Sequence, residues 1–562
     1  MKKLIALLLC LVMVVSVLAG CGAKAPVANN GGNEGAANNG GNSNIPDDVV
    51  LTIGIPQNGK VEDYDTNAYT LWLEEVTGYD LQFRVYQGTA ADYKSQLSVS
   101  LVDGEELPDM LIGFDLGTRV YEEYGEDGYF IDMKPYFDDK TKSQVWWDRF
   151  AQLEDQEWQD YIWDKMVSNV DGGIYAFPRL ESTPYDCMSG QVFINQDWLT
   201  ALNLEMPTDT ESLYQVLKAF KTKDPNGNGK ADEVPIIGTT GNYGDTITWL
   251  VNMFVYMNKE RFWRVDDQGQ LYHIYGSDEY REALIFINKL VKEGLLPSSI
   301  WTMDSNAVRN MLAPGDNVQT VGIFVGHPTL SLAVNNENAF SYVAMPYWGH
   351  ATILDQANSW NTFITEDCDY PDAAWNLLMV MASEEGSYRL RYGQKGVDWV
   401  EADPDTVSYL NLPATLKIIN EGAYTDMGNE CWKAIVATIL LNAENEACQL
   451  SDDMNDWLQH KMGMMLDCYN YFYEAVERNP DNIVGVLDYS VEEDEYVNVS
   501  RSNTQGFINQ CMASFCTGSG KEYNDPNNDA QWAAYLKGIE AQDIATWQEV
   551  AQDVYDWQYA GK

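Results

Sequence analysis

Residues 197–238 have the sequence DWLTALNLEMPTDTESLYQVLKAFKTKDPNGNGKADEVPIIG, which joins an amphipathic helix to an acidic loop. Thr208 followed by Glu211 forms a capping box, the signature of a helix start. Four apolar residues then recur at helical spacing and give the helix one apolar face: Leu213, Val216, Leu217 and Phe220. The sequence therefore predicts a helix that packs through this face and runs directly into the loop.

The acidic loop, residues 224–233, has the spacing of a calcium-binding loop. Five residues place oxygen atoms at loop positions 1, 3, 5, 7 and 9: Asp224, Asn226, Asn228, Lys230 through its backbone carbonyl, and Asp232. Gly229 permits the sharp turn at position 6, whereas Pro235 stands where an EF-hand has a bidentate Glu, so Glu233 would complete the ligand shell. We interpret the loop as a structural Ca²⁺ site; the alternative is an acidic turn that binds no ion.

Further motifs follow along the chain: GGIYAFP at 172–178, KLVKEGLL at 289–296, RLRYGQKGVDW at 389–399, FCTGSG at 515–520 and WAAYLKGIEAQDIATWQEVAQDVYDW at 532–557. Together with residues 197–238 they resemble the family 1 extracellular solute-binding proteins of bacterial ABC importers, in the carbohydrate-binding branch that includes alginate-oligosaccharide-binding proteins. The resemblance implies an α/β, two-lobed, periplasmic-binding-protein-like (type II) fold, with a hinge between the lobes and a helix-rich C-terminal part. It also implies an oligosaccharide ligand, ABC permease subunits as partners and no catalysis.

The first 20 residues have the features of a lipoprotein signal peptide. A short basic region precedes an apolar run at 4–17, and Leu18-Ala19-Gly20-Cys21 resembles a lipobox. The resemblance implies that Cys21 is acylated, with chains such as palmitate, and anchors the protein to the extracellular face of the cell membrane. The alternative is an ordinary cleaved signal. Residues 21–48 are rich in Gly, Asn and Ala and too poor in apolar residues to fold, which predicts a flexible tether.

From residue 49 the chain alternates β-like and helical segments. Strands are predicted at 49–55, 81–86 and 110–114, with helices at 66–76 and 92–101 between them. This rhythm indicates βαβ units and a mostly parallel sheet. Helices are also predicted at 278–292, capped by Ser277, and from Pro371 to about residue 381.

The resemblance implies a division of the chain into two lobes. Residues 49–170 plus about 321–365 would form the N-terminal lobe, and residues 171–320 plus about 366–562 the C-terminal lobe. The apolar segment 321–325 is predicted to be the strand that returns to the first lobe. The chain after the tether has about 510 residues, above the size at which single cores stop growing, which agrees with two lobes.

The charge composition of the chain limits the classes of ligand that it can bind. The chain has 85 acidic and 35 basic residues, a net charge of -50. Such a charge repels polyanions, so nucleic acid is excluded as a partner, and neutral glycans are favoured over uronate-rich ones. We expect a monomer.

Candidate ligand-contacting residues come from strand ends and from aromatic loops. Ligands gather beyond the carboxyl ends of parallel strands, and sugars stack on aromatic rings, of which 18 Trp and 34 Tyr are available. The candidates are Gln57, Asn58, Phe114, Asp115, Tyr185, Asp186, Trp249, Trp348 and Trp360. Arg391 and Tyr392 either face the ligand or support a helix end.

Enzymatic motifs are missing from the sequence. The four histidines have no HExxH or other zinc-ligand spacing, and no GxSxG elbow occurs. The abundance of carboxylates makes any glycosidase-like pair uninformative. Seven cysteines follow Cys21, an odd number that leaves at least one unpaired within the chain. Two other readings stay open: a receptor for a peptide or other non-sugar solute, and a surface protein that captures or degrades glycans.

Overall fold

The computed structural model describes residues 45–562 except 47, 89, 154–155, 169–170, 182–187, 189, 242–243, 260, 315–317, 333–339, 353–357, 407, 409–412, 421–422, 424–426, 435, 441–447, 450–455 and 560–562. The predicted signal peptide, Cys21 and most of the predicted tether lie outside these residues. Within the described part, no helix has the length and apolar character needed to cross a membrane.

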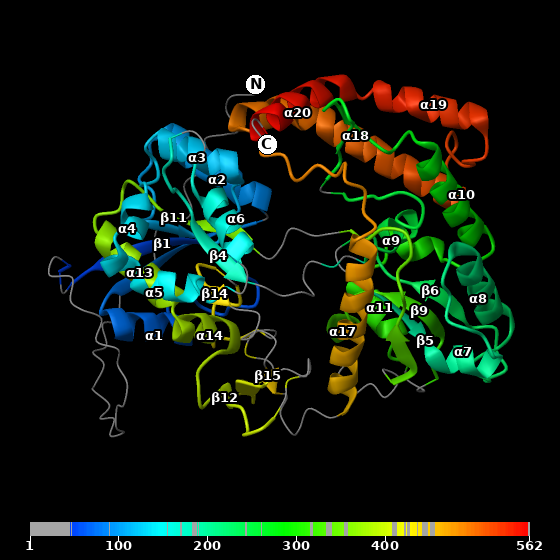
Figure 1. Ribbon diagram of the computed structural model, residues 1–562, viewed down its shortest axis with the longest axis horizontal. Coiled ribbons are helices and arrows are strands. Elements are labelled where there is room, and N and C mark those ends of the chain that lie inside the picture. The colour runs from blue at the N-terminus through cyan, green and yellow to red at the C-terminus, as the bar shows by residue number, and fades with distance from the viewer. Residues whose placement is uncertain are drawn as a thin grey trace, which may run out of the picture. The chain divides into compact units, whose positions relative to one another are not determined.

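A six-stranded sheet forms the centre of one half of the structure, which we call the first lobe (Figure 1). Its strand order is β14 (Ile439–Leu440), β4 (Phe177–Glu181), β11 (Asn358–Ile364), β3 (Met110–Ile112), β1 (Val50–Pro56) and β2 (Asp80–Tyr86). β1 pairs in parallel with both β2 and β3, which confirms the predicted βαβ units. β11 is antiparallel to β3 and β4, so the sheet is mixed.

Helices cover both faces of this sheet (Figure 1). They are α1 (Ala68–Thr77), α2 (Ala90–Asp103), α3 (Thr118–Glu126), α4 (Lys134–Asp138), α5 (Lys140–Phe150), α6 (Gln156–Met166), α13 (Pro371–Ala382) and α14 (Glu384–Tyr392). The predicted helix at 66–76 is confirmed as α1. Asn67 caps its start by accepting a hydrogen bond from the amide of Tyr69, and Gly78 ends it with a φ of 77°.

A four-stranded sheet forms the centre of the second lobe. Its order is β10 (Tyr342–Ala344), β5 (Val192–Asn195), β9 (Val321–Val325) and β6 (Val234–Ile237). Two parts of the predicted lobe division differ from this topology. The strand at 321–325 pairs with β5 and β6 instead of returning to the first lobe, whereas β4 pairs with β11 in the first sheet. The region around residues 366–392 also differs, because α13 packs against α1 and α5.

The second lobe is rich in helices. They are α7 (Gln196–Leu202), α8 (Thr210–Thr222), α9 (Thr246–Val251), α10 (Asp278–Lys292), the 3₁₀ turn Ser298–Trp301, α11 (Ser305–Met311), α12 (Pro328–Ser331), α17 (Asp456–Val476), α18 (Val491–Thr517), α19 (Asp529–Glu540) and α20 (Ile544–Gln558). The predicted helix at 278–292 is confirmed, with Ser277 as its cap. The capping box of α8 is displaced by one residue from the prediction. Asp209 and Ser212 form it, in place of Thr208 and Glu211.

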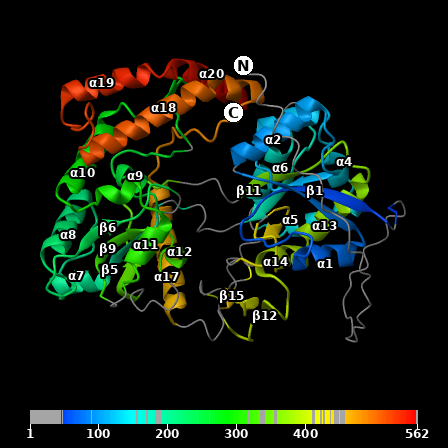
Figure 2. The ribbon, with the colours of Figure 1, turned by 180° about the vertical axis from the view of Figure 1, so that it is seen from behind.

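The long C-terminal helices are part of the second lobe and not an appendage. α18 packs against α10 and α20, and Figure 2 shows these helices together at one end of the lobe. One hydrophobic core runs from the four-stranded sheet into them, with Phe324, Leu284, Phe515 and Trp547 all buried within it. A two-stranded hairpin, β7 (Arg264–Val265) and β8 (Leu271–Tyr272), lies against α20. A separate three-stranded sheet contains β12 (Trp399–Glu401), β13 (Leu416–Ile418) and β15 (Cys448–Gln449).

Candidate functional site

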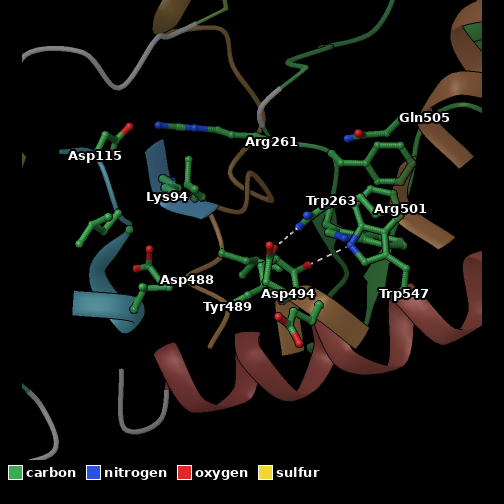
Figure 3. Close-up of a pocket in the computed structure, with 18 of the residues that line it drawn as sticks. Lys94, Asp115, Arg261, Trp263, Asp488, Tyr489, Asp494, Arg501, Gln505 and Trp547 are labelled. Atoms are coloured by element: carbon green, nitrogen blue, oxygen red, sulfur yellow. Dashed lines mark hydrogen bonds and ion pairs between the residues drawn. The ribbon is translucent and has the colours of Figure 1, made fainter. Parts of the chain in front are cut away.

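A cavity of about 510 Å³ lies where α2 and α3 of the first lobe meet the second lobe (Figure 3). The first lobe contributes Lys94, Ser98, Asp115 and Tyr124 to its walls. The second lobe contributes Arg261, Trp263, Asp488, Tyr489, Arg501 and Trp547. A cavity of this size, with an aromatic wall and a few converging polar groups, has the character of a small-molecule binding site.

Asp115 reaches the cavity because β3 ends just before it. The backbone amides of Gly113 and Phe114 both donate to the carbonyl of Asn361, at 2.8 and 2.9 Å, and the Phe114 ring is fully buried. The next side chain, Asp115, is exposed. The strand end is therefore anchored, and it presents a carboxylate at the edge of the sheet where ligands of open α/β sheets bind.

The opposite wall is positioned by the start of α18. The Ser490 hydroxyl accepts a hydrogen bond from the amide of Glu493 at 3.1 Å, and the Glu493 carboxylate accepts one from the amide of Ser490 at 2.9 Å. This capping box fixes the first turn of the helix. Asp488 and Tyr489, which come directly before it, are thereby held at the cavity.

Aromatic and charged groups of this wall form a connected network. The Trp547 indole donates to the Tyr489 hydroxyl at 3.0 Å, so the hydrogen of that hydroxyl is left to donate to another acceptor. Burial raises the pKa of Tyr489 to about 12, which keeps it protonated at neutral pH. The ring of Trp263 lies 5.0 Å from that of Trp547, and Arg501 forms an ion pair with Asp494 at 2.7 Å. Trp263 and Trp547 are buried in the core of the second lobe, with exposed fractions of 3% and 2%, so the half-buried rings of Tyr124 and Tyr489 offer the aromatic surface of the cavity beside these fixed hydrogen-bonding groups.

The charge of the cavity is mixed, with an acidic excess. Three cationic side chains line it, Lys94, Arg261 and Arg501, against four acidic ones, Asp115, Asp488, Asp494 and Glu495. One cation, Arg501, is already matched by Asp494. Figure 3 shows Arg261 extended toward the side of the cavity that carries Asp115. Such a lining favours a neutral ligand rich in hydroxyl groups over a polyanion.

The structure places the predicted ligand-contacting residues in several environments. Asp115 lines the cavity. Phe114 and Trp249 lie in the two hydrophobic cores, with exposed fractions of 0% and 5%, because β3 and α9 turn these side chains inward. Tyr185 and Asp186 lie outside the described residues.

Six other predicted residues are described but do not line the cavity: Gln57, Asn58, Trp348, Trp360, Arg391 and Tyr392. The side-chain amide of Asn58 donates to the carbonyl of Lys433 at 2.7 Å, which ties the end of β1 to a distant segment. Trp348 and Trp360 are half-buried against the cores of the two lobes. Tyr392 packs in a small apolar cluster with Tyr388 and Trp399. Ligand contacts by these six residues stay predictions.

Several cavity residues were missed from the sequence, although a signal for some of them exists. The segment Ser490-Val491-Glu492-Glu493 is a capping box, so the residues directly before it belong to the junction of two helices. Junctions at helix ends are common places for binding residues. Trp263 and Trp547 carry no comparable signal, since neither their spacing nor their neighbours distinguish them from core tryptophans.

The acidic loop has the internal hydrogen bonds of an ion-binding turn. The amide of Gly229 donates to Asp224 Oδ2 at 3.0 Å, the amide of Asn228 to Asn226 Oδ1 at 3.1 Å, and the amide of Lys230 to Asn228 Oδ1 at 2.7 Å. Gly229 takes the left-handed conformation expected of it, with a φ of 73°. The side-chain oxygens are thus oriented by the backbone of the loop itself.

Glu233 is the residue of this loop that most needs a cation. Its exposed fraction is 2%, and its Oε1 atom has no hydrogen-bond partner among the described residues. Burial raises the pKa of this carboxyl, with smaller contributions from Asp232 and Asp224. The described residues contain no cluster of three His, Cys, Asp or Glu side chains suited to a metal ion, so the asparagine and backbone oxygens would have to take part. The residues of the loop fit a hard cation.

Comparisons with known sequences identify relatives along most of the chain. Residues 56–388 match the model of a family described as bacterial extracellular solute-binding protein. The fructooligosaccharide ABC transporter substrate-binding protein FusA of Streptococcus pneumoniae is 23% identical over 518 residues, which cover 87% of each chain. The lipoprotein LipO of Bacillus subtilis is 27% identical over 234 residues, 42% of each chain.

Solved structures agree in fold. An HMO-binding solute-binding protein associated with an ABC transporter, from Bifidobacterium longum infantis, has a TM-score of 0.68 at 17% identity and covers 90% of this chain and 98% of its own. FusA, solved as an EF-hand mutant in complex with fructo-nystose, has a TM-score of 0.67 at 19% identity and covers 91% of this chain and 100% of its own. The predicted two-lobed α/β fold is confirmed.

Proposed function

Because this chain belongs to the bacterial extracellular solute-binding protein family, we propose that it captures an oligosaccharide outside the cell and delivers it to an ABC permease. The observation that carries the proposal is the cavity between α3 and the segment 485–505, whose walls combine aromatic rings with exposed hydroxyl-binding groups. Its relatives support the ligand class, since FusA is named for fructooligosaccharides and the Bifidobacterium protein for HMO.

The ligand is a neutral oligosaccharide. Sugars offer apolar C–H faces to aromatic rings and hydroxyl groups to carboxylates and amides. Asp115 and Asp488 can accept hydrogen bonds from sugar hydroxyls, and the Tyr489 hydroxyl can donate to a sugar oxygen. The net charge of -50 and the acidic excess in the cavity oppose uronate-rich ligands.

Capture would proceed by hinge closure of the two lobes. A ligand that touches both walls binds the closed arrangement more tightly than the open one, and this difference drives the equilibrium to closure. The receptor holds its ligand without transforming it. We propose that it works as a monomer held on the extracellular face of the membrane.

The experiment that tests this function is a thermal-shift screen of the purified protein. The panel contains nystose, a neutral human-milk-type tetrasaccharide, an oligogalacturonate and a tetrapeptide. We expect a concentration-dependent rise in Tm with a neutral oligosaccharide, and the same glycan recovered unchanged by chromatography. A shift with the peptide alone would mean that the ligand is a peptide and not a sugar. Cleavage of the glycan would mean that the protein is an enzyme and not a receptor.

We further propose that the acidic loop holds a structural Ca²⁺ ion, with Asp224, Asn226, Asn228, Asp232, Glu233 and the carbonyl of Lys230 as its ligands. The hydrogen bonds that orient the loop and the unpaired Glu233 oxygen support this assignment. FusA, a relative in fold, has been solved as an EF-hand mutant. When bound, the ion neutralises the loop carboxylates and stiffens the link between α8 and β6.

Removal of calcium by EGTA is expected to lower the Tm, because an ion that binds only the folded state stabilises it by mass action. At a calcium concentration 100 times the Kd, the loss in unfolding free energy is about 2.7 kcal/mol. The measurement is calorimetry with and without EGTA, followed by re-addition of Ca²⁺. Asp232→Asn should abolish the calcium response, whereas Asp266→Asn, in an exposed turn outside the loop, should preserve it. If EGTA left the Tm unchanged, the assignment of a structural Ca²⁺ ion to the loop would be wrong.

We propose that Cys21 carries the lipid anchor. LipO, a relative over part of the chain, is described as a lipoprotein, which supports the assignment. Cys21→Ser is expected to lose incorporation of labelled palmitate and to shift the protein from the membrane fraction to the medium. Cys10→Ser, within the predicted signal peptide, is the matched control and should leave labelling intact. Equal labelling of both variants would contradict the anchor.

A further inference from the structure

Arg119, in the first turn of α3, joins the first lobe to the second. Its Nη1 atom lies 2.7 Å from Oε2 of Glu493 in α18, an ion pair with a charge-assisted hydrogen bond. The guanidinium also lies 4.8 Å from the ring centre of Trp557 in α20. α3 packs through Tyr121 in the core of the first lobe, whereas α18 and α20 belong to the core of the second. One side chain therefore makes two contacts across the lobes.

Glu493 is held in place by its own helix. Its Oε2 atom accepts hydrogen bonds from the amide and the hydroxyl of Ser490, at 2.9 and 2.8 Å, and forms the capping box of α18. The carboxylate thus offers Arg119 a partner of fixed position. Because glutamine also serves at this position of a capping box, the charge of Glu493 can be removed without loss of the cap.

The ion pair borders a hollow of about 730 Å³ with a strongly acidic lining. The carboxylates come from both lobes: Glu123, Glu126 and Asp127 from the first, and Glu492, Glu493 and Glu495 from the second. Arg119 is the one base among the described residues that line this hollow. Since like charges repel, bringing the two acidic edges together is unfavourable, and Arg119 offsets part of this repulsion.

The contact lies outside the segments in which the chain passes between the lobes. These passages lie between β4 and β5, between β10 and β11, and between β14 and α17. Neither α3 nor the start of α18 belongs to any of them. If the lobes rotate about such connecting segments, the distance between Arg119 and Glu493 changes with closure. The pair is therefore made in the closed arrangement and lost in the open one.

We propose that Arg119 is a positioning residue that clasps the two lobes and strengthens ligand binding without touching the ligand. The inference rests on the proposed function and adds an electrostatic element to the closure of the lobes. Neither Arg119 nor Glu493 is among the residues that line the cavity of about 510 Å³. The clasp raises the fraction of molecules in the closed arrangement, and the apparent Kd of a ligand that binds this arrangement falls accordingly.

Isothermal titration calorimetry with the parent and variants tests the clasp. The probe is nystose or the neutral human-milk-type tetrasaccharide, whichever raises the Tm in the thermal-shift screen. Arg119→Ala should raise the Kd by about 3- to 10-fold, because it removes both cross-lobe contacts and leaves the acidic edges without their base. Glu493→Gln should raise it by about 2- to 5-fold. The double variant should match Arg119→Ala within about twofold, because both changes remove the same ion pair.

Glu123→Gln is the matched control. Glu123 contacts the same guanidinium, with 3.7 Å between Arg119 Nε and Glu123 Oε1, but it lies one turn along α3 in the same lobe. Glu123→Gln and Glu493→Gln each remove one negative charge from the hollow, so their comparison isolates the contact across the lobes. The Kd of Glu123→Gln should stay within about twofold of the parent. An equal loss of affinity in both variants would contradict the clasp.

The salt dependence distinguishes an electrostatic clasp from a merely structural role. Raising the NaCl concentration from about 0.02 M to about 0.5 M screens an ion pair between partly exposed charges. The Kd of Glu493→Gln divided by that of the parent should therefore fall toward one at high salt. A ratio that stays constant and above one would mean that Glu493 acts through the fold of α18 and not through its charge.

Small-angle X-ray scattering of the ligand-free proteins supplies a readout that needs no glycan. The radius of gyration should be larger for Arg119→Ala than for the parent, and equal for Glu123→Gln and the parent. Equal radii for Arg119→Ala and the parent, or parent-like affinity of Glu493→Gln, would overturn the inference. If no glycan bound, the proposed function would fail, whereas the scattering comparison would still decide whether Arg119 holds the lobes together.

Discussion

Asp115→Ala is expected to weaken binding of the stabilising oligosaccharide by about 10- to 100-fold. A hydrogen bond to a charged group contributes about 1.5–3 kcal/mol, and each 1.4 kcal/mol is about a factor of ten in Kd. Asp115 is exposed at the cavity, and its place after β3 is fixed by the bonds of Gly113 and Phe114 to Asn361. The measurement is isothermal titration calorimetry with parent and variant.

The matched control is Asp80→Ala, which removes an exposed carboxylate at the start of β2, outside the cavity. Its Kd should stay within about twofold of the parent, as surface changes away from a site have little effect. The Tm of the ligand-free Asp115→Ala variant should also match the parent. If Asp115→Ala bound the oligosaccharide as tightly as the parent, Asp115 would not contact the ligand. The proposal that the first lobe forms one wall of the binding site would then be wrong.

Trp432→Ala is expected to lower the free energy of unfolding by about 3–5 kcal/mol, the range for removing a large buried aromatic side chain. Trp432 is fully buried, and its ring packs edge-on against Tyr69 at 5.2 Å and Phe83 at 5.6 Å. Its indole donates to the Thr70 hydroxyl at 2.8 Å, so truncation also leaves that hydroxyl without its donor. Urea unfolding, with calorimetry as a check on cooperativity, measures the change.

Trp557→Ala serves as the control for this change, because the same side chain is removed from a site where 37% of it is exposed. The loss in unfolding free energy should remain below about 1 kcal/mol. The pair of variants separates burial from residue type. If Trp432→Ala were as stable as Trp557→Ala, residues 428–433 would not be a structural part of the first lobe.

The local elements of the fold could be predicted from the sequence, because each has its own signals. The strand β1, the helix α1 with its Asn67 cap, and the helix α10 after Ser277 all begin and end near polar caps or glycines. The predicted position of the α8 capping box was wrong by one residue, because Thr208, Asp209 and Ser212 offer overlapping caps. The pattern of polar and apolar residues predicts that a helix or strand is present better than it predicts the residue at which that element ends.

The division into lobes depends on pairings that no local pattern carries. β9 has a fully buried apolar pattern that suits a central strand of either sheet, and it pairs with β5 and β6. Trp432 reaches back to Thr70, which lies 362 residues earlier in the chain. Sequence periodicity fixes which face of a strand is buried but not against which partner.

The lining of the candidate cavity was predictable where a strand end contributes to it and not where tertiary packing does. Asp115 follows from the rule on parallel strands. Tyr489 and Trp547 meet at the cavity although they are 58 residues apart. Trp249 shows the converse, since its position in a loop-rich stretch suggests exposure, whereas α9 turns it into the core.

The most direct test of the central claim is hydrogen exchange of the purified protein with and without the oligosaccharide that gives the largest thermal shift. The account predicts slower exchange on both walls of the cavity, in peptides that cover residues 92–98 and 115–124 of the first lobe and 485–505 of the second. Protection on both sides would establish a ligand held between the lobes. Protection confined to one lobe, or to segments that do not line the cavity, would contradict the account.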